Sequence, residues 1–474
     1  MAEAHNGSRK TPAGSAAWPR RPRVRDTPWA LLVGLALFVF AFSLWMNLDE
    51  IRASRFHPDE SRWINRAYYI RELGDPFGET WSDQYLIRGQ PPMGSYVIGL
   101  GLLLQGHDVT TNGPWDFHRG DEWNVNWNAT YGNMPSQADL EASRKTNAVI
   151  GALTVAAVFV IATRLTNWIG GLAGALFLAY NPLQTGLSSQ ALSDALLGLI
   201  IALATLVIMA LADRPTWPRL ILLGVLLGAG ASAKLSPLFL AAGLAVIGAV
   251  LLLDPWLRRV PLLGRLAAWR GPANRPRQLR LGWMLLALPV ITSAFFVLSY
   301  PYLWPDPVGR TMNLIEFRQQ EMESQARIWG DRAVDTRFEA LERTWAGFAD
   351  RYTTSGRVVE KVGEIFGQDW ARRGYDPPLE LAGLLVFAAI ALNRGMLSRH
   401  FMALALIGGQ AAAIVVGMRV DFNRYYLPIL LFFAVCIGVL AGAAWDHLPR
   451  FFAAVAARRR APVRRRETSA APAD

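Results

Sequence analysis

The fold of this chain is decided first at residues 28–48, which read PWALLVGLALFVFAFSLWMNL. The stretch carries no charged side chain, and it is long enough to cross the hydrocarbon core of a bilayer, which takes about 20 helical residues. It is too long for the apolar region of a signal peptide, and no convincing cleavage site follows it, so we interpret it as an uncleaved membrane anchor. The basic residues 1–27, rich in Pro, Ala and Ser, are expected to form a disordered cytoplasmic tail.

The composition extends this pattern to the rest of the chain. Hydrophobic residues make up 52% of the 474 residues and charged residues 18%, and the apolar ones come in long blocks rather than at amphipathic spacing. This pattern predicts an all-α polytopic membrane protein. The one cysteine, Cys436, lies inside an apolar block. The sequence therefore excludes a disulfide framework and a cysteine metal site.

Ten apolar blocks are candidates for membrane spans. They cover residues 28–48, 146–163, 168–187, 191–212, 218–233, 235–254, 281–304, 379–393, 400–418 and 425–445. If the N-terminus lies in the cytoplasm, the short, strongly basic segments all fall on the cytoplasmic side, as the positive-inside rule requires. The expected parts are a transmembrane domain at residues 28–445, a first extracytoplasmic loop at 49–145, a basic cytoplasmic loop at 258–280, a long extracytoplasmic loop at 305–378 and a basic cytoplasmic tail at 446–474.

One further apolar stretch, residues 93–105, must not cross the membrane for this topology to hold. It is short and follows Pro91-Pro92, which favours an interfacial or re-entrant helix. If it crossed, the two richest arginine clusters would face outward. In the long outer loop, residues 313–329 are expected to form an amphipathic helix.

The net charge of +11 raises the question of a nucleic-acid partner. The arginines, however, gather in the N-terminal tail, at residues 258–280 and at residues 458–466, each next to a predicted span. Positive charge in these places suits membrane orientation and contact with anionic lipid. We therefore expect membrane lipids, and not nucleic acid, as partners.

An acidic pair lies just beyond the first span, in His57-Pro58-Asp59-Glu60. Proline at the first helical position followed by acids is an ordinary helix start, because acids complement the helix dipole. Two carboxylates at a membrane surface are also suited to acid–base chemistry. Both interpretations can hold together.

The predicted topology brings three further charged residues to the same outer face. Asp194 is the first charged residue of a predicted span, and its purely structural explanation is that of an acid in the first turn of a helix. Lys234 and Arg424 lie between or before apolar blocks, where their alternative is an interfacial side chain that reaches to water. Charges at such positions are costly in a membrane protein and commonly functional.

These residues belong to a series of short motifs. In chain order the segments are His57-Pro58-Asp59-Glu60 followed by Trp63, Ala67 and Tyr69; Gln90-Pro91-Pro92-Met93-Gly94; Gln190-Ala191-Leu192-Ser193-Asp194-Ala195; Ala233-Lys234-Leu235-Ser236-Pro237; and Arg424-Tyr425-Tyr426-Leu427-Pro428. The series resembles that of the GT-C glycosyltransferases, most closely the family of the protein O-mannosyltransferases and the lipid A aminoarabinose transferases. The resemblance implies a GT-C-like bundle of about ten transmembrane helices, with juxtamembrane helices in the extracytoplasmic loops.

The resemblance also implies an activity. Such enzymes transfer a single sugar from a polyprenyl-phosphate donor to an acceptor hydroxyl outside the cytoplasm, typically with inversion. Asp59 would be the general base, with Glu60 and Asp194 beside it in the catalytic set. The donor would be bound by Lys234, Arg424 and Arg88. The chemistry is reasonable, since a carboxylate can take the proton of the hydroxyl and cations can stabilise a departing phosphate.

The chain departs from the family at two positions. Gln90 stands where the aminoarabinose transferases have a lysine, and Ser95 where the mannosyltransferases have one. The sugar is therefore not assigned from either subfamily, and the acceptor can be a protein, a lipid or a glycan.

No cofactor is expected. His57, His107 and His118 share the first loop with Asp116, Asp121 and Glu122, but without the tight spacing of a zinc site. Since members of the family differ in metal dependence, dependence on a divalent metal ion remains an alternative.

The strongest alternative function is a transporter or flippase of lipid-linked sugars. Transporters usually place ionisable residues near the bilayer midplane between inverted repeats. Here the charges of interest gather at one face and no repeat is evident, which favours the enzyme. The composition, rich in Arg and Ala, is typical of a high-GC genome and predicts a multi-pass protein of the bacterial cytoplasmic membrane with an extracytoplasmic active site.

Overall fold

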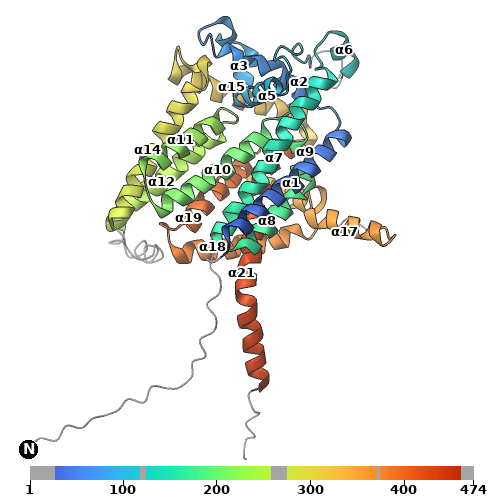
Figure 1. Cartoon of the computed structure of the whole chain (residues 1–474). Coiled ribbons are helices and arrows are strands. Elements are labelled where there is room, and N and C mark those ends of the chain that lie inside the picture. Colours follow the sequence, from blue (N-terminus) through green and yellow to red (C-terminus); the bar gives the residue numbers. More distant parts are fainter. Residues whose placement is uncertain (1–26, 118–123, 258–274, 371–373, 461–474) are drawn as a thin grey trace, which may run out of the picture.

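The structure is a computed structural model that describes residues 27–117, 124–257, 275–370 and 374–460. Within these ranges the chain is almost entirely helical, and its one extended pairing is an antiparallel bridge between Ala333 and Val420. The predicted all-α class is therefore confirmed (Figure 1).

Eight helices in the described residues are long and apolar enough to cross a membrane. They are α1 (Trp29–Ala53), α7 (Gln137–Leu165), α10 (Asp194–Asp213), α12 (Ser236–Leu257), α14 (Arg275–Leu298), α18 (Asp376–Arg394), the continuous run from α19 (Arg399–Ala403) through η8 (Leu404–Gly408) to α20 (Gly409–Gly417), and α21 (Leu427–Arg460). Each corresponds to one of the ten predicted spans.

The other two predicted spans are shorter helices within the same bundle. The block at 168–187 is divided into α8 (Trp168–Ala179) and α9 (Pro182–Ser188), because Pro182 lacks an amide hydrogen and the Asn181 side chain caps the new helix. The block at 218–233 is α11 (Trp217–Ala231). Helix α8 packs against α7 and α21, and α11 packs against α10 and α14. The prediction of about ten membrane helices was therefore approximate.

The apolar stretch at 93–105 forms the short helix α5 (Met93–Leu104). Its 12 residues span about 18 Å, less than the roughly 30 Å of a hydrocarbon core. Helix α5 packs against α7 and against the short turn η2 (Arg66–Tyr68). These properties are consistent with a helix that does not cross.

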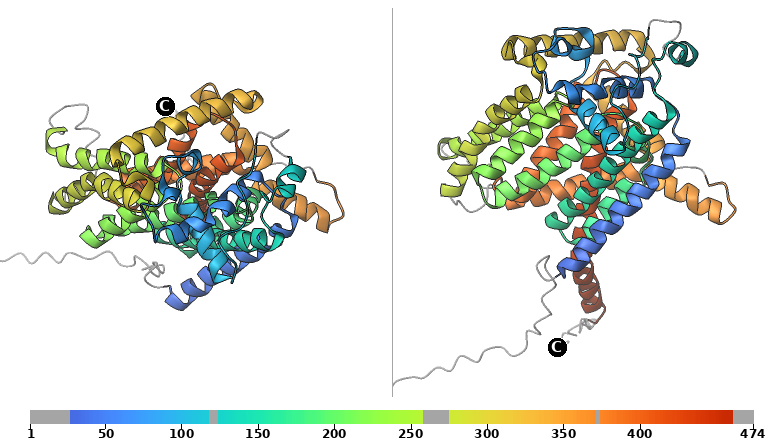
Figure 2. Two further views of the ribbon diagram at one scale, coloured as in Figure 1. Left: turned by 90° about the horizontal axis from the view of Figure 1, so that it is seen from above. Right: turned by 45° about the horizontal axis from the view of Figure 1, so that its top comes forward.

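Several short helices gather with α5 at one end of the bundle, where they form a cap (Figures 1 and 2). They are α2 (Pro58–Asn65), α3 (Tyr69–Glu72), η3 (Glu79–Trp81), α4 (Tyr85–Gly89), α6 (Val125–Thr130), η5 (Pro301–Leu303) and α15 (Pro307–Ile328). Helix α15 covers the range predicted for an amphipathic helix, 313–329, as far as Ile328. The segments η6 (Gly330–Arg332), α16 (Arg337–Ala346), η7 (Gly347–Arg351) and α17 (Thr354–Ile365) then lead back to α18.

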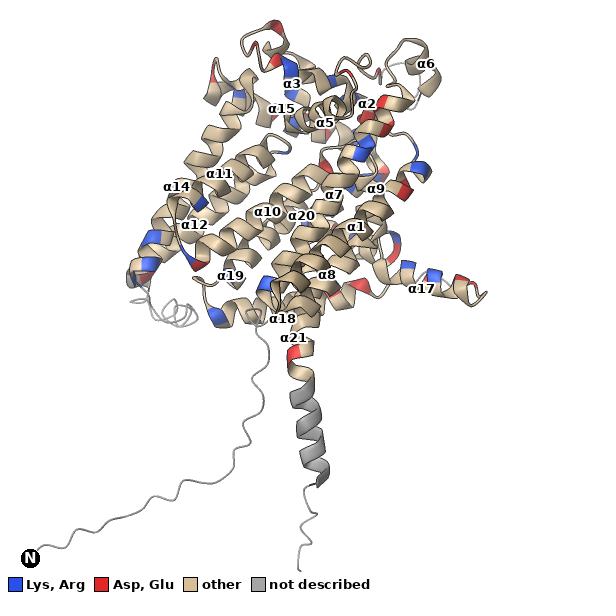
Figure 3. Ribbon diagram, viewed as in Figure 1, with Lys and Arg blue, Asp and Glu red and all other residues tan. Residues whose placement is uncertain are grey.

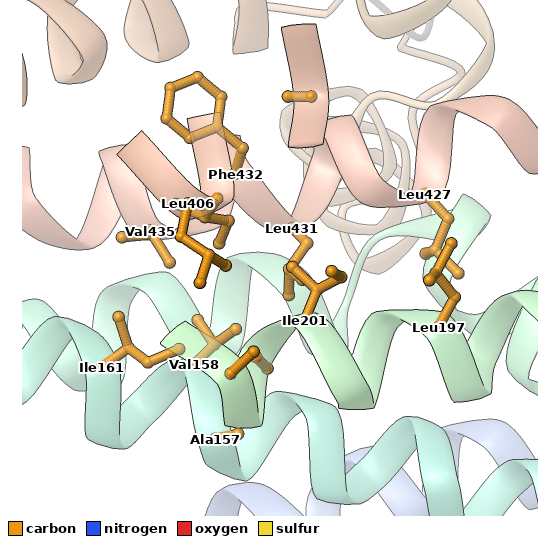
Figure 4. Close-up of a cluster of buried hydrophobic side chains, with 14 of the residues drawn as sticks. Ala157, Val158, Ile161, Leu197, Ile201, Leu406, Leu427, Leu431, Phe432 and Val435 are labelled. Atoms are coloured by element: carbon orange, nitrogen blue, oxygen red, sulfur yellow. The ribbon is translucent and has the colours of Figure 1, made fainter. Parts of the chain in front are cut away.

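The centre of the bundle is formed by α7, α10 and α21. Figure 4 shows their apolar side chains in contact; the labelled residues are Ala157, Val158 and Ile161 of α7, Leu197 and Ile201 of α10, Leu406 of η8, and Leu427, Leu431, Phe432 and Val435 of α21. In contrast, α1 leaves large apolar side chains such as Leu37 and Trp45 exposed. In a membrane protein such a surface faces the acyl chains.

Small residues let α8 and α21 approach closely. A Cβ atom at Gly170 would lie 2.4 Å from the Gly438 carbonyl oxygen, and one at Gly174 would lie 2.6 Å from that of Ala434. Both distances are shorter than van der Waals contact, so only glycine fits. This is the small-residue packing common between membrane helices.

Charged residues are sparse along the bundle and concentrate at its two ends (Figure 3). Helix α21 continues to Arg460, into the segment assigned from the sequence to the C-terminal tail. Residues 1–26, 258–274 and 461–474 lie outside the described residues, as do His118, Asp121 and Glu122. The predicted N-terminal tail and most of the basic cytoplasmic loop therefore fall outside as well.

Candidate active site

The acidic motif after the first span is a capped helix start. The His57 side chain accepts a hydrogen bond from the Asp59 amide at 3.1 Å, and the Glu60 carboxylate accepts one from the His57 amide at 3.0 Å. With Pro58 at the first position, these contacts form a capping box that fixes the first turn of α2. The helix-start interpretation of the motif is therefore correct, and it fixes the direction in which Asp59 points.

Asp59 forms an ion pair with Arg424, which is 365 positions away in the chain. The carboxylate is mostly buried, and burial alone would raise its pKa. The positive charges of Arg424, His57 and Arg62 oppose this effect, so the pKa of Asp59 lies below its ordinary value of 3.8. Asp59 is therefore ionised at neutral pH.

A second ion pair joins Asp194, the first residue of α10, to Lys234 in the turn before α12. The Tyr425 ring lies between the two pairs: its centroid is 5.7 Å from the Lys234 ammonium and 5.9 Å from the Arg424 guanidinium. Asp194 also acts electrostatically on Arg424. The two pairs and Tyr425 thus form one cluster, in which 26% of the Lys234 side chain and 23% of the Arg424 side chain are exposed.

Glu60, next to Asp59, is differently placed. Its carboxylate is fully buried and receives hydrogen bonds from Arg144 at 2.8 and 2.7 Å, from the Ala191 amide at 2.8 Å and from the His57 amide. Each oxygen already accepts two hydrogen bonds. Glu60 therefore uses both of its oxygens to hold neighbouring segments of the site together.

The segment that follows the Pro-Pro pair is packed against the cluster. The Met93 amide donates to the Ser232 carbonyl at 2.8 Å, two residues before Lys234. A Cβ atom at Gly94 would lie 2.6 Å from the Trp63 ring and 2.8 Å from the Ser193 Cβ atom, next to Asp194. The structure therefore brings together all five motif segments that the sequence singled out.

Among the described contacts of Arg88, the remaining predicted site residue, none is with a residue of this cluster. Its described contacts are an ion pair with Asp83 at 3.1 Å and a cation–π contact with Phe317 of α15, 5.4 Å from the ring centroid. The neighbouring Gln90 instead accepts a hydrogen bond from Arg66, a buried arginine that also donates to the carbonyls of Arg62 and Leu86. Where the aminoarabinose transferases have a lysine, this chain thus has Gln90, and another segment supplies a cation, Arg66, beside it.

Sequence reasoning missed Arg62, Arg66, Arg144 and the placement of Tyr425. Arg62 lies one helical turn after Asp59, which was an available signal because residues three apart share a helix face. Arg144 stands just before the apolar block at 146–163, where a lone arginine resembles an interfacial anchor. Nothing in the sequence marks it as the partner of Glu60.

Within the described residues, no three His, Cys, Asp or Glu side chains lie close enough to hold a metal ion. Two buried polar atoms beside the cluster have no hydrogen-bond partner, namely Nε of Arg62 and Oγ of Ser193. Buried polar atoms normally find partners.

A comparison with protein families finds one match to this chain. The family model described as dolichyl-phosphate-mannose-protein mannosyltransferase matches residues 125–269. This segment includes Asp194 and Lys234, whereas Asp59 and Arg424 lie outside it. Among curated proteins, no relative of the chain is found.

Solved structures with a similar fold include an oligosaccharyltransferase from Archaeoglobus fulgidus tethered with an acceptor peptide. It has a TM-score of 0.48 and 14% identity, over 89% of this chain and 51% of that protein. ArnT from Cupriavidus metallidurans bound to undecaprenyl phosphate has a TM-score of 0.45 and 19% identity, over 91% and 63%. A protein O-mannosyltransferase complex of S. cerevisiae bound to the sugar donor has a TM-score of 0.38 and 18% identity, over 57% and 33%.

The chain spans less than two thirds of the length of each of these structures. The resemblance to the protein O-mannosyltransferase family that the motifs predicted is confirmed over residues 125–269, where the chain matches the family model described as dolichyl-phosphate-mannose-protein mannosyltransferase.

Proposed function

We propose that this chain is an integral-membrane glycosyltransferase that moves a single sugar from a polyprenyl-phosphate donor to an acceptor hydroxyl. The observation that carries the proposal is the convergence of Asp59, Asp194, Lys234 and Arg424 in one partly exposed cluster. They come from α2, α10, the turn before α12 and the turn η9 (Asn423–Tyr426) before α21. Mostly buried ion pairs contribute little net stability, so their presence favours a functional explanation.

The cations of the cluster suit a phosphate leaving group. Lys234 and Arg424 lie 5.7 Å and 5.9 Å from the Tyr425 ring centroid, and Arg62 acts on the same carboxylate as Arg424. A phosphate monoester released by the reaction carries a charge of about −1.5 to −2 near neutral pH. Positive charges fixed in advance stabilise this negative charge as the sugar–phosphate bond breaks. Since α10, α12 and α21 all start beside the cluster, a lipid tail on the phosphate can remain in the bilayer.

Asp59 is the proposed general base. The acceptor oxygen attacks the anomeric carbon as its proton passes to the Asp59 carboxylate, and the bond from that carbon to the phosphate oxygen breaks with its electron pair. Attack from the side opposite the phosphate inverts the anomeric centre. The lowered pKa keeps Asp59 ionised while Arg424 is paired with it, but it also makes the carboxylate a weaker base. A donor phosphate competes with Asp59 for Arg424, so donor binding would free a carboxylate oxygen for the acceptor.

The donor class is consistent with the family model that matches residues 125–269, whose description names a sugar on dolichyl phosphate. The cluster lies at the end where α1 finishes, opposite the N-terminus of α1. With a cytoplasmic N-terminus this is the extracytoplasmic face, and a bacterial cytoplasmic membrane is the proposed location. The sugar, and the choice among protein, lipid and glycan acceptors, are left to experiment.

The test is sugar transfer by the purified protein in nanodiscs, offered a panel of polyprenyl-phosphate sugars and acceptors. We expect one donor to release polyprenyl phosphate with the wild type and not with Asp59→Asn. Asp108→Asn is the matched control, because Asp108 is an exposed carboxylate at the same end that pairs with Arg71. Full activity of Asp59→Asn would refute the assignment of the base. Turnover of none of the donors, under conditions in which a known transferase is active, would refute the proposed reaction.

A further inference from the structure

Helix α17 has two chemically distinct faces. Val358, Val362 and Ile365 are spaced four and three apart and therefore share one face, whereas the charged residues Arg357, Glu360 and Glu364 lie on the other, and Lys361 lies at the border between the two. The protein leaves much of the apolar face uncovered: 45% of Val358 and 74% of Ile365 are exposed, while Val362 is half-buried. Just beyond the helix, Phe366 is 69% exposed and stacks on Trp370.

The first turn of α17 is fixed to the start of α18. The Asp376 carboxylate accepts hydrogen bonds from the amides of Thr354 and Ser355, the latter at 2.9 Å. The Ser355 hydroxyl in turn accepts one from the Tyr375 amide at 2.7 Å. The start of α17 therefore lies at the same height in the bundle as the first residue of α18.

The length of α18 indicates where this point lies relative to the membrane. The helix has 19 residues and spans about 28 Å, while the hydrocarbon core is about 30 Å thick. Because α18 needs its whole length to cross, Asp376 lies at the membrane boundary. The N-terminus of α17 lies at this boundary too.

From this point α17 extends away from the bundle. Figure 1 and the right view of Figure 2 both show it projecting sideways, beyond α18 and α8. Its near end is held by Asn181, whose side chain donates to the Tyr352 carbonyl at 2.7 Å, and by Arg357, which lies over the Tyr180 ring. A helix that leaves a membrane bundle sideways at the boundary runs along the lipid surface.

We propose that α17 lies in the plane of the membrane, with Val358, Val362 and Ile365 toward the acyl chains and Glu360, Lys361 and Glu364 toward water. Amphipathic helices of this kind insert their apolar face about 5–10 Å into the boundary between headgroups and acyl chains. Trp370, near the end of the helix, suits the same layer. The partner of this surface is the bilayer, and the proposal does not depend on the enzymatic function.

Spin labels on single cysteines test the placement in the full-length protein in nanodiscs. Labels go on the apolar face at Val358→Cys and Ile365→Cys, and on the charged face at Glu360→Cys and Glu364→Cys as matched controls. The wild type measures background labelling, since its one thiol, Cys436, is buried. Collision with oxygen, which concentrates in lipid, is compared with collision with a water-soluble nickel chelate.

We expect oxygen to dominate at positions 358 and 365 and the nickel chelate to dominate at positions 360 and 364. Dominance of the nickel chelate at all four positions would place the helix in water and overturn the proposal. Protection of positions 358 and 365 from both reagents would mean that protein covers this face. A second copy of the chain would then be the partner, and the bilayer assignment would be wrong.

Discussion

Arg144 of α7 and Glu60 of α2 form a buried, two-pronged ion pair that joins three segments of the site. The Arg144 guanidinium also donates to the carbonyls of Ser54 and Arg55, at and just after the end of α1, each at 3.1 Å. Glu60 also holds the Ala191 amide, three residues before Asp194. One pair thus ties the end of α1, the start of α2, which carries Asp59, and the segment just before α10, which begins at Asp194.

The first prediction concerns the stability of this pair. Arg144→Ala leaves the Glu60 carboxylate buried without its counter-ion, which costs about 3–5 kcal/mol. We expect a clear fall in the thermal unfolding temperature in detergent. Removing both charges, in Glu60→Gln with Arg144→Met, should recover part of the loss because no unpaired charge remains. An unfolding temperature unchanged in Arg144→Ala would mean that the pair does not hold these segments.

The second prediction concerns the pH dependence of transfer. Arg62 is one of the positive charges that keep the pKa of Asp59 below 3.8, although it is not the ion-pair partner. In Arg62→Gln the raising effect of burial is opposed less, so the pKa of Asp59 rises. Because the base must be ionised, the acid limb of the profile of kcat/KM against pH should move to higher pH than in the wild type.

Arg71→Gln is the matched control for this measurement, since Arg71 pairs with the exposed Asp108 and not with the cluster. Its acid limb should coincide with that of the wild type. An acid limb of Arg62→Gln that stays in place, or moves to lower pH, would show that the Arg62 charge does not act on the base.

The third prediction separates donor binding from folding. Lys234→Met removes a proposed phosphate contact, and a charge-assisted hydrogen bond is worth about 1.5–3 kcal/mol. We expect KM for the lipid-linked donor to rise about 10- to 100-fold, since each 1.4 kcal/mol is tenfold. The loss also leaves Asp194 unpaired, so Lys234→Met with Asp194→Asn should regain stability without regaining affinity. Lys234→Met with the KM of the wild type would remove this residue from the donor site.

Much of the fold could be predicted from the sequence because an apolar block in a bilayer must satisfy its own backbone hydrogen bonds, and a helix does so. Every predicted span contains a helix, but the prediction at 168–187 missed the new helix that starts at Asn181-Pro182, and the helix predicted at 281–304 runs from Arg275 to Leu298 instead. The Asn181-Pro182 dipeptide is a recognisable break, but the apolar residues on both sides conceal it in a search for long blocks.

The sequence was enough to predict which residues belong to the site, but not which of them form ion pairs with one another. Span ends alone placed Asp59, Asp194, Lys234 and Arg424 on one face, because each adjoins an apolar block. Which acid meets which base depends on how the helices pack, and no local pattern encodes that. The same limit explains Arg88, whose position before the Pro-Pro pair suggested the site but whose contacts are with Asp83 and Phe317.

The last prediction tests the junction of the motifs at Gly94 in α5. A methyl group there would lie 2.6 Å from the Trp63 ring and 2.8 Å from the Ser193 Cβ atom, so α5 must move away from α2 or from the start of α10. Overpacking of this kind costs about 1–3 kcal/mol, and the shift would also displace the helix starts that carry Asp59 and Asp194. Gly94→Ala should therefore lower both the unfolding temperature and the transfer rate. Gly243→Ala in α12 is the matched control, because no atom lies within 4 Å of its added methyl group, and it should lower neither. If Gly94→Ala behaved like Gly243→Ala, the close packing of the Pro-Pro segment against Trp63 and Ser193 would be refuted.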